Sequence, residues 1–455
     1  MQIIADLHLH SKFSRAVSPS MDLTGITNWS AKTGINLVTT GDWTHPIWFK
    51  SIKTELKETA PGIFTHNTNP HVKLLLSTEI SSIYSQGDRS RRMHNLIFSP
   101  SISTSEKIIN ELRSRGANLL SDGRPIIGLS SKNLLELVMG IDKNCLLIPC
   151  HIWTPWFSLF GSKSGFDSIV ECFGQENARN IYAIETGLSS DPIMNWQIKE
   201  LESRSIVSFS DAHSGPKLGR EATVFTENPN FQFPISKQIS NFKQPISNFS
   251  YEDIVKAIKQ DSTGKLKIGY TIEFFPEEGK YHWTGHRSCN VRYRPQEVKE
   301  EGTICPVCHQ PLTVGVENRV LDLSSKIISQ DDLLLIKNNV GLTFVYDKEK
   351  KRRPFVSLIP LMEILIEVNG GSNTKAVREY ERLVTSFASE FDILLRKTYD
   401  EIEKAGGEKL RQAIQIVRER KVFVDPGYDG VFGKVKIFND NEIEASTIEK
   451  QQTLF

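Results

Sequence analysis

Two histidines near the beginning of the chain are the first residues that could do chemistry. His8 and His10 end the apolar run 3–10, IIADLHLH. Because side chains two residues apart in a β-strand point to the same face, both imidazoles are expected to project together from the end of one strand. Paired imidazoles are typical metal ligands, although histidines with this spacing also cap strands or face solvent. The weight of the pair therefore depends on what accompanies it downstream.

Ligand-type side chains recur beside the later apolar runs, which cover residues 35–40, 72–77, 95–98, 145–150, 181–185 and 205–210. The side chains that adjoin these runs are Asp42, His45, Glu79, His94, His151, Glu185, Asp211 and His213. Parallel strands that close side by side bring their carboxyl ends to one mouth, where barrel enzymes hold their active sites. Each residue alone is as simply explained by a helix cap or a core histidine, but the recurrence favours one shared site.

A mixture of histidine, aspartate and glutamate is typical of a multinuclear zinc or manganese centre, with magnesium as a further candidate. Such a centre suits phosphodiester hydrolysis, because one metal activates water to hydroxide while its neighbours neutralise the phosphate and the leaving oxygen. We predict Glu79, Asp211 and His213 as catalytic residues. In this interpretation Asp211 or His213 orients the hydroxide or protonates the leaving oxygen.

A second metal site is predicted further along the chain. His286 and Cys289 form one pair, Cys305 and Cys308 form another, and residues 290–304 separate them. A gap of two residues inside each pair places both ligands on one knuckle, and two knuckles close a tetrahedral site. With four protein ligands and no open position, this zinc is expected to be structural. His282 is the alternative first ligand.

The composition is that of an ordinary globular protein. A chain of 455 residues is long enough for about two to four domains. Its 55 Lys and Arg nearly balance its 54 Asp and Glu, so any nucleic-acid surface has to be a local patch. No apolar run approaches the roughly 18 residues of a membrane span, and the chain opens on a strand rather than a signal peptide, so we expect a cytoplasmic protein. Its cysteines are then reduced, with Cys145, Cys150 and Cys172 buried and the others bound to metal.

Two basic runs are candidates for contacts with nucleic-acid phosphates. Arg89, Arg91 and Arg92 stand immediately before His94, where they would meet the phosphates of an extended substrate. Arg352 and Arg353 end a second run, for which a solvated surface is an equally good explanation.

The last part of the chain combines helices with a glycine-rich loop. Residues 374–420 have apolar side chains at helical spacing, with a break at Gly406-Gly407. In the loop 422–434, Tyr428 and Phe432 are either part of an ordinary turn or one wall of a base-binding pocket. The final residues, QQTLF, place Gln451, Leu454 and Phe455 in a pattern that resembles a peptide that docks on the replication sliding clamp; a frayed tail is the alternative.

The motifs of the first half resemble those of the PHP phosphoesterase superfamily. They are HLH at 8–10, TTGD at 39–42, TE at 78–79, His94, PCH at 149–151 and SDAH at 210–213. The resemblance implies a distorted seven-stranded barrel and a centre of two or three metals. It also implies a ligand ring of His8, His10, Asp42, Glu79, His94, His151, Asp211 and His213. The usual Asp-His pair is here Asp42-Trp43-Thr44-His45, so His45 is an alternative or additional ligand.

The whole order of segments resembles the endonuclease Q family. That resemblance implies a DNA repair endonuclease that nicks double-stranded DNA 5′ to hypoxanthine, uracil, xanthine or an abasic site, leaving a 3′-hydroxyl and a 5′-phosphate. We therefore expect an α/β fold with a PHP-type barrel, a zinc module and an α-helical C-terminal domain. The expected boundaries are 1–275 for the barrel, with an insertion at 226–250, then 276–345, 346–438 and a tail at 439–455. We expect a nucleoid-associated monomer; a phosphatase of small phosphomonoesters and a non-catalytic DNA adaptor are the rival functions.

Overall fold

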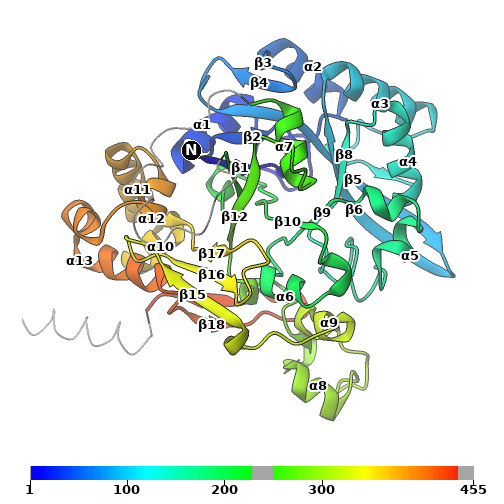
Figure 1. Cartoon of the computed structure of the whole chain (residues 1–455). Coiled ribbons are helices and arrows are strands. Elements are labelled where there is room, and N and C mark those ends of the chain that lie inside the picture. Colours follow the sequence, from blue (N-terminus) through cyan, green and yellow to red (C-terminus); the bar gives the residue numbers. More distant parts are fainter. Residues whose placement is uncertain (1, 228–248, 439–455) are drawn as a thin grey trace, which may run out of the picture.

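The computed structural model describes residues 2–227 and 249–438. It is a mixed α/β structure, which confirms the predicted fold class (Figure 1). Most of the predicted insertion at 226–250 lies outside the described residues, as do Gln451, Leu454 and Phe455 of the predicted clamp peptide. In the part of the chain that the structure describes, no helix is long and apolar enough to cross a membrane.

The first region is built on strands that include most of the runs expected from the sequence. The hydrogen-bonded order is β11 (Ala222–Thr226), β1 (Gln2–Asp6), β2 (Leu37–Thr39), β5 (Lys73–Gln86), β6 (Arg89–Ser99) and β8 (Leu146–Pro149). β1, β2 and β5 are parallel, whereas β11 and β6 run antiparallel to their neighbours. A separate parallel pair follows, β9 (Ala183–Glu185) and β10 (Ser205–Val207). Shorter strands on the outside are β3 (Leu56–Ala60), β4 (Ile63–His66) and β7 (Ile126–Ile127).

These strands are apolar at successive residues because both of their faces are covered. In β1, Ile3 and Ala5 belong to an inner apolar cluster, whereas Ile4 belongs to the outer core. The inner cluster takes side chains from all eight of these main strands and from α7 (Tyr251–Ile258). The backbone ladder is interrupted between β8 and β9 and between β10 and β11, where Ser208 N donates to Thr223 Oγ1 at 3.0 Å. A common interior fits the expected barrel, and its assignment as a PHP barrel stays an interpretation.

Helices cover the outside of the strands and begin at polar caps. They are α1 (Leu23–Thr33), α2 (Pro46–Glu55), α3 (Ile102–Ser114), α4 (Ser131–Ile141), α5 (Ile169–Phe173) and α6 (Pro192–Trp196). The side chains of Asp22, Ser101 and Ser130 each accept a backbone N–H of the first turn, which satisfies a donor that the helix itself leaves free. The caps fix where each of these helices starts.

The large sheet continues from the first region into the C-terminal part. β12 (Lys267–Glu273) pairs with β11 on one side and with β17 (Phe355–Ser357) on the other, and β16 (Thr343–Asp347) and β15 (Leu333–Lys337) follow. A small module lies beside them, with β13 (Thr284–His286), β14 (Val291–Tyr293), α8 (Pro295–Glu301) and α9 (Val316–Leu323). The predicted domain boundaries stay predictions, since one sheet joins segments on both sides of residue 275.

The C-terminal helices pack around a buried arginine. They are α10 (Leu361–Val368), α11 (Asn373–Phe387), α12 (Glu390–Leu395) and α13 (Tyr399–Arg418), followed by β18 (Phe423–Asp425) and β19 (Lys434–Lys436). Gly407 has φ 81°, which confirms the expected break inside α13. Arg418 is 1% exposed and donates to the carbonyls of Leu394, Val340 and Ile393 at 2.7 to 3.0 Å. These bonds join α12 and α13 to the β15–β16 hairpin.

Candidate active site

His8 and His10 lie just beyond β1, with both side chains fully buried. Their Nε2 atoms face the same carboxylates. His10 Nε2 is 3.2 Å from Glu79 Oε2 and 3.2 Å from Asp211 Oδ1, and His8 Nε2 is 3.7 Å from Asp211 Oδ1. One ligand atom each of His8, His10 and Asp211 lie within 4.8 Å of one another, the spacing of a metal site. The first predicted pair is thus part of a group that could hold a metal.

A second group adjoins the first through Glu79. Its Oε1 is 2.7 Å from His94 Nδ1 and 3.3 Å from His151 Nε2, and those two nitrogens are 3.3 Å apart. Glu79, His94 and His151 again lie within 4.8 Å. Because Oε2 of the same carboxylate faces His10, Glu79 is placed as a bridging carboxylate is in a multinuclear centre.

The donor set fits divalent cations. Among the described residues, His8 Nε2, His10 Nε2 and Asp211 Oδ1 are buried without a hydrogen-bond partner. Leaving buried polar atoms unsatisfied costs about 1–3 kcal/mol each, which a bound cation would relieve. Nitrogen and carboxylate oxygen are the donors that zinc and manganese take.

The charges of the site also favour a cation. Burial by itself would raise the pKa of Glu79, but His94 and Arg124 hold it well below its usual value. Burial likewise opposes ionisation of Asp211, whereas His8 and His10 lower its pKa. Both carboxylates are therefore ionised at neutral pH.

Carboxylates behind the ring orient the imidazoles. Glu185 oxygens lie 2.9 and 3.1 Å from His8 Nδ1, and Oε2 accepts the backbone N–H of His151 at 2.8 Å. Asp42 Oδ1 is 3.0 Å from His10 Nδ1. A carboxylate on Nδ1 fixes the tautomer and leaves Nε2 free to bind metal.

Asp42 was predicted as a member of the ligand ring, and the structure places it behind His10 instead. Its Oδ2 accepts Ser11 N at 2.6 Å, Ser11 Oγ at 2.7 Å and Ser14 Oγ at 2.9 Å. Both oxygens are thus engaged by protein groups. Its alternative, His45, caps α2 and lies 3.2 Å from the carbonyl of Leu120 through Nε2. Neither residue is among the groups whose atoms gather closely enough for a metal.

Three residues of the site have a strained backbone. Asp42, His151 and Asp211 have φ of 49°, 28° and 47°. Residues with a Cβ rarely adopt positive φ, and such conformations persist where surrounding contacts hold them, often at functional sites.

His213 lies at the edge of the ring rather than within it. Its Nδ1 is 2.9 Å from the carbonyl of Asp211, its ring is 4.8 Å from the ring of His10, and its side chain is 34% exposed. Burial lowers its pKa below the usual value, so the imidazole is neutral at neutral pH.

The sequence reasoning missed Arg124. Its Nη1 lies 3.0 Å from Glu79 Oε2, and the facing carboxylate raises the pKa of the guanidinium. The residue stands in a loop far from any ligand motif, so only its place in space identifies it. Cys150, expected to be buried, is buried, and its sulfur lies within reach of His8 and Glu79.

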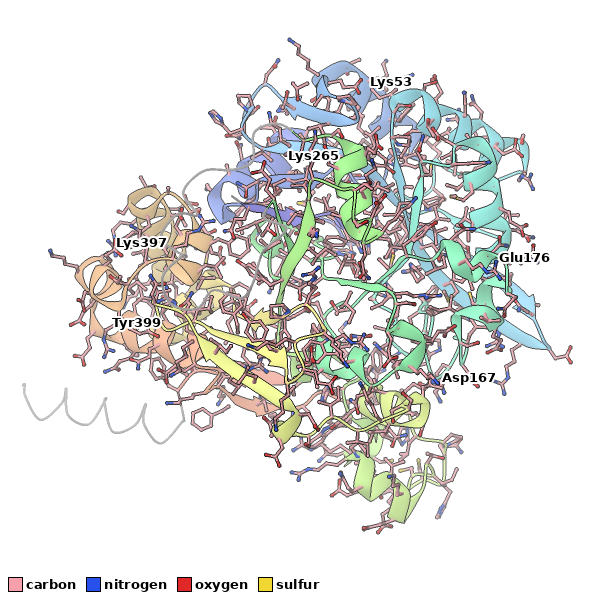
Figure 2. All side chains as sticks on the ribbon, in the orientation of Figure 1. Lys53, Asp167, Glu176, Lys265, Lys397 and Tyr399 are labelled. Atoms are coloured by element: carbon pink, nitrogen blue, oxygen red, sulfur yellow. The ribbon has the colours of Figure 1, made fainter. Side chains whose placement is uncertain are left out.

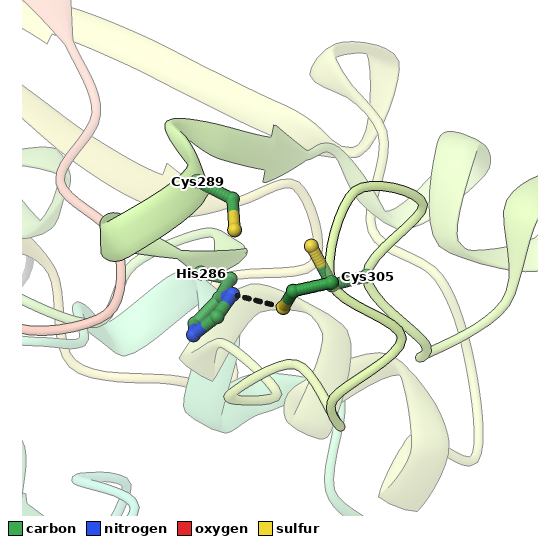
Figure 3. Close-up of side chains that lie close together, drawn as sticks. His286, Cys289 and Cys305 are labelled. Atoms are coloured by element: carbon green, nitrogen blue, oxygen red, sulfur yellow. Dashed lines mark hydrogen bonds between the residues drawn. The ribbon is translucent and has the colours of Figure 1, made fainter.

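The four predicted ligands of the second site also meet. His286, Cys289, Cys305 and Cys308 offer atoms within 4.8 Å of one another, and Cys308 Sγ is 3.3 Å from His286 Nδ1 (Figure 3). Burial opposes ionisation of Cys305, but the backbone N–H of Cys308 and the His286 side chain lower its pKa to about 6. His282 is not among these ligands; its Nε2 lies 3.8 Å from Glu317. The identity of the metal as zinc stays a prediction.

The module with these cysteines docks on the loop that follows His151. Arg319 in α9 donates to the carbonyls of Phe160 and Phe166 at 2.9 and 3.1 Å and pairs with Asp167, which is labelled in Figure 2. In the same loop, the carbonyl of Phe157 accepts the backbone N–H of His94 at 3.1 Å. The loop 151–167 therefore links the module to a residue of the ring.

The three arginines predicted to contact phosphates, Arg89, Arg91 and Arg92, differ in their exposure. Arg91 is 7% exposed, donates to the carbonyl of Gly165 and lies 2.9 Å from Glu171. It therefore holds the fold together, and the predicted contact of Arg91 with DNA phosphates is wrong. Arg89 is exposed at the tip of the β5–β6 hairpin, and half-buried Arg92 lies over the ring of Phe157.

The glycine-rich loop lies against the module. Tyr428 is 8% exposed and donates from its hydroxyl to Asn290 at 2.7 Å. Phe432 is 62% exposed, with the Lys280 ammonium 4.4 Å from its ring centre. Of the two predicted stacking residues, Phe432 is therefore the exposed one. Arg352 and Arg353 lie elsewhere, beside β10 and β12.

The α/β fold thus carries two separate clusters that could hold metal ions, a histidine and carboxylate ring and a cysteine cluster. Comparison with solved structures is more specific. The structure matches the lesion-specific endonuclease PfuEndoQ of Pyrococcus furiosus with a TM-score of 0.77 and 28% identity, covering 98% of this chain and 99% of that one. It matches endonuclease Q in complex with a 27-mer duplex substrate with an abasic lesion at the active site equally well, with a TM-score of 0.77 and 29% identity over 97% and 98% of the two chains. These two matches over nearly the whole length of both chains support assignment of the chain to the endonuclease Q family.

Sequence comparisons agree without adding an activity. A family model, the MJ0043 C-terminal domain, matches residues 360–421, which include α10 to α13. The uncharacterized protein MJ0043 of Methanocaldococcus jannaschii is 30% identical over 311 residues, which are 68% of this chain and 33% of that protein. The chain thus spans about a third of the length of this relative.

Proposed function

We propose that this protein is a DNA repair endonuclease that nicks the phosphodiester 5′ to a deaminated base or an abasic site, leaving a 3′-hydroxyl and a 5′-phosphate. Hypoxanthine, uracil and xanthine are the proposed deaminated bases. The observation that carries the proposal is the match over nearly the whole chain to endonuclease Q bound to a lesion duplex, together with the buried ring.

The ring residues divide into ligands and supports. His8, His10, Glu79, His94, His151 and Asp211 are the proposed metal ligands. Glu185 and Asp42 hold His8 and His10 by Nδ1. Divalent metals bound there would supply an activated water and neutralise the charge of the phosphate. Arg124 is placed to add a positive charge beside the same phosphate.

His213 is the proposed proton acceptor for the attacking water. Its Nδ1–H donates to the carbonyl of Asp211, and its lowered pKa keeps it neutral, so Nε2 has a free lone pair. Asp211 is ionised because its pKa is lowered, so it has no proton to give to the leaving 3′-oxygen. Between the two roles considered for Asp211, orientation of the water is therefore favoured.

DNA is proposed to cross between the ring and the cysteine module. The damaged nucleotide leaves the stack, at a lower cost when it is mispaired, and packs on the exposed ring of Phe432 near Tyr428. Arg89 and Arg92 are proposed to contact backbone phosphates, which position the duplex without reading its sequence. The terminal residues Gln451, Leu454 and Phe455 are proposed to dock on the sliding clamp.

A nicking assay tests the proposal. Duplexes labelled at one 5′ end carry a single deoxyinosine, deoxyuridine, abasic site or normal base. Wild-type protein is expected to give one nick 5′ to each lesion, and the His8→Ala, Asp211→Ala double variant none. His71→Ala, a change of an exposed histidine at the other end of the strands, is the matched control. Equal cutting of normal DNA, or release of phosphate from a small phosphomonoester without nicking, would contradict the proposal.

A further inference from the structure

A cavity of about 320 Å³ lies at the end of the strands opposite the ring. It is lined by Arg204 and Ser205 at the start of β10 and by Lys267 at the start of β12. β10 leads towards Asp211 at its carboxyl end. β12 is antiparallel to β11, which is antiparallel to β1, so β12 runs in the direction of β1 and its first residue is remote from His8. The cavity is therefore separate from the candidate active site.

Positive charge predominates in the lining. The basic side chains are Arg204, Lys267, Lys350, Lys351, Arg352 and Arg353, and the acidic ones are Glu202 and Asp261. Arg352 lies 3.4 Å from Glu202, and Lys351 is 2.5 Å from Glu349 outside the cavity. Arg204, Lys267 and Arg353 still outnumber Asp261, the remaining carboxylate of the lining, so the cavity attracts anions.

Two of the guanidinium groups have donors to spare. Arg204 donates to Ser203 Oγ at 3.2 Å and to the carbonyl of Ala178 at 3.0 Å, while its buried Nε has no partner among the described residues. No described residue forms a hydrogen bond or ion pair with the Arg353 side chain. Burial lowers the pKa of Arg204, which reflects the cost of holding a cation away from water. An anion beside Arg204, within reach of the exposed Arg353, would offset that cost.

We propose that this cavity binds a small phosphate-bearing anion of nucleotide size. Guanidinium groups match phosphate oxygens through paired hydrogen bonds. Pro192 and Trp196, both buried, belong to the apolar part of the lining. The volume is at the lower end of the range of small-molecule sites, roughly 300–1,000 Å³. A duplex carries its phosphates on a convex surface that does not enter such a cavity, so a free nucleotide rather than DNA is the expected occupant. The inference does not rest on the proposed nuclease activity.

Calorimetric titration of the whole protein at constant ionic strength tests this, with inorganic phosphate, deoxyadenosine monophosphate and deoxyadenosine triphosphate as probes. Binding of a nucleotide to one site per chain is expected. Arg353→Gln and Arg204→Gln are each expected to weaken it by about tenfold, the value of one charged hydrogen bond. Lys57→Gln, an exposed cation on β3, is the matched control and is expected to change nothing. Circular dichroism checks that each variant is folded; Arg353 is exposed, so its replacement does not disturb the core.

Three results would overturn the proposal. The first is that no probe binds, and the second is that both arginine variants leave binding unchanged. The third is that a lesion-free duplex displaces the nucleotide and that the affinity for this duplex falls equally in Arg353→Gln. The last result would make the cavity part of a DNA-binding surface. Binding of phosphate alone, lost in both variants, would support the anion site and remove the nucleotide from the proposal.

Discussion

The ring and the cysteine module gather metal-type donors in opposite ways. The ring draws its residues from positions 8 to 211, from five places in the first region, and all but Asp211 and His151 are buried. The module takes its four donors from positions 286 to 308, and only Cys305 is buried. Strands packed on a common core preform the ring, and orienting carboxylates stand behind it. The module has few such supports, so its metal itself must supply much of its order.

The largest expected effect comes from removing a ring ligand. His10→Ala deletes an imidazole that faces both Glu79 and Asp211. Single-turnover nicking of an abasic duplex is expected to fall at least about 10³-fold, because a metal contributes several kcal/mol to the transition state. The temperature at which the cysteine module loses half of its zinc should not change. Nicking within a few-fold of wild type would show that the ring is not the catalytic centre.

Removing an orienting carboxylate should have a smaller effect. Glu185→Gln keeps the size of the side chain but weakens its hold on His8 Nδ1. Changes of this kind cost about 10- to 100-fold in activity or metal affinity. Nicking at rising Mn²⁺ concentration measures the loss, and excess metal should recover part of it. Asp42→Asn is expected to act in the same way through His10; a loss as large as that of His10→Ala would instead make Asp42 a ligand, as the sequence resemblance implied.

A weaker effect is expected from separating the two regions. Arg319→Ala removes the contacts of α9 with Phe160, Phe166 and Asp167, and with them the support of the loop that holds Phe157 against His94. Nicking is expected to fall by up to about tenfold while both metal sites stay filled, since one charged hydrogen-bond group is lost. Arg319→Lys keeps the charge but lacks the planar guanidinium, so its nicking rate should lie between those of wild type and Arg319→Ala. Full activity of Arg319→Ala would show that the module does not support the ring.

The smallest effect concerns a region with neither kind of site. Glu390 in α12 accepts the N–H of Leu361 at 2.7 Å and the hydroxyl of Tyr380 at 2.8 Å, and burial raises its pKa from 4.5 to about 7. Its protonation favours the folded state, so this contribution is full below pH 4.5 and declines as the pH rises to about 7, by at most about 1.4 kcal/mol per pH unit. Glu390→Gln should flatten the fall in unfolding free energy between pH 5 and 7. If the dependence of the unfolding free energy on pH were the same in Glu390→Gln and wild type, groups other than Glu390 would cause it.

The same comparison explains what the sequence could predict. The Cys/His cluster is local, so the spacing of its ligands was enough to find it. The ring could be predicted because its ligands lie beside apolar runs that pack together, although Glu79 and His94 lie inside the long strands β5 and β6 rather than after them. The contact of Arg124 with Glu79 could not be predicted, because packing alone decides where a loop residue lies. The supporting role of Asp42 could not be predicted either, because packing also decides which groups its carboxylate contacts. Arg91 looked like a surface charge, yet its guanidinium is buried by the loop 151–167. Strands β15 to β17 were missed because they extend a sheet that begins far away in the chain.

Metal content tests the central claim most directly. Mass spectrometry of purified wild-type protein, of the His8→Ala, Asp211→Ala variant and of the Cys305→Ser, Cys308→Ser variant counts the metal ions per chain. Two independent sites predict more than one metal in the wild type, a single zinc in the ring variant, and retained ring metals in the cysteine variant. A wild-type protein with one metal, lost only from the cysteine variant, would contradict a metal-dependent ring and leave a DNA-binding protein without this catalytic centre.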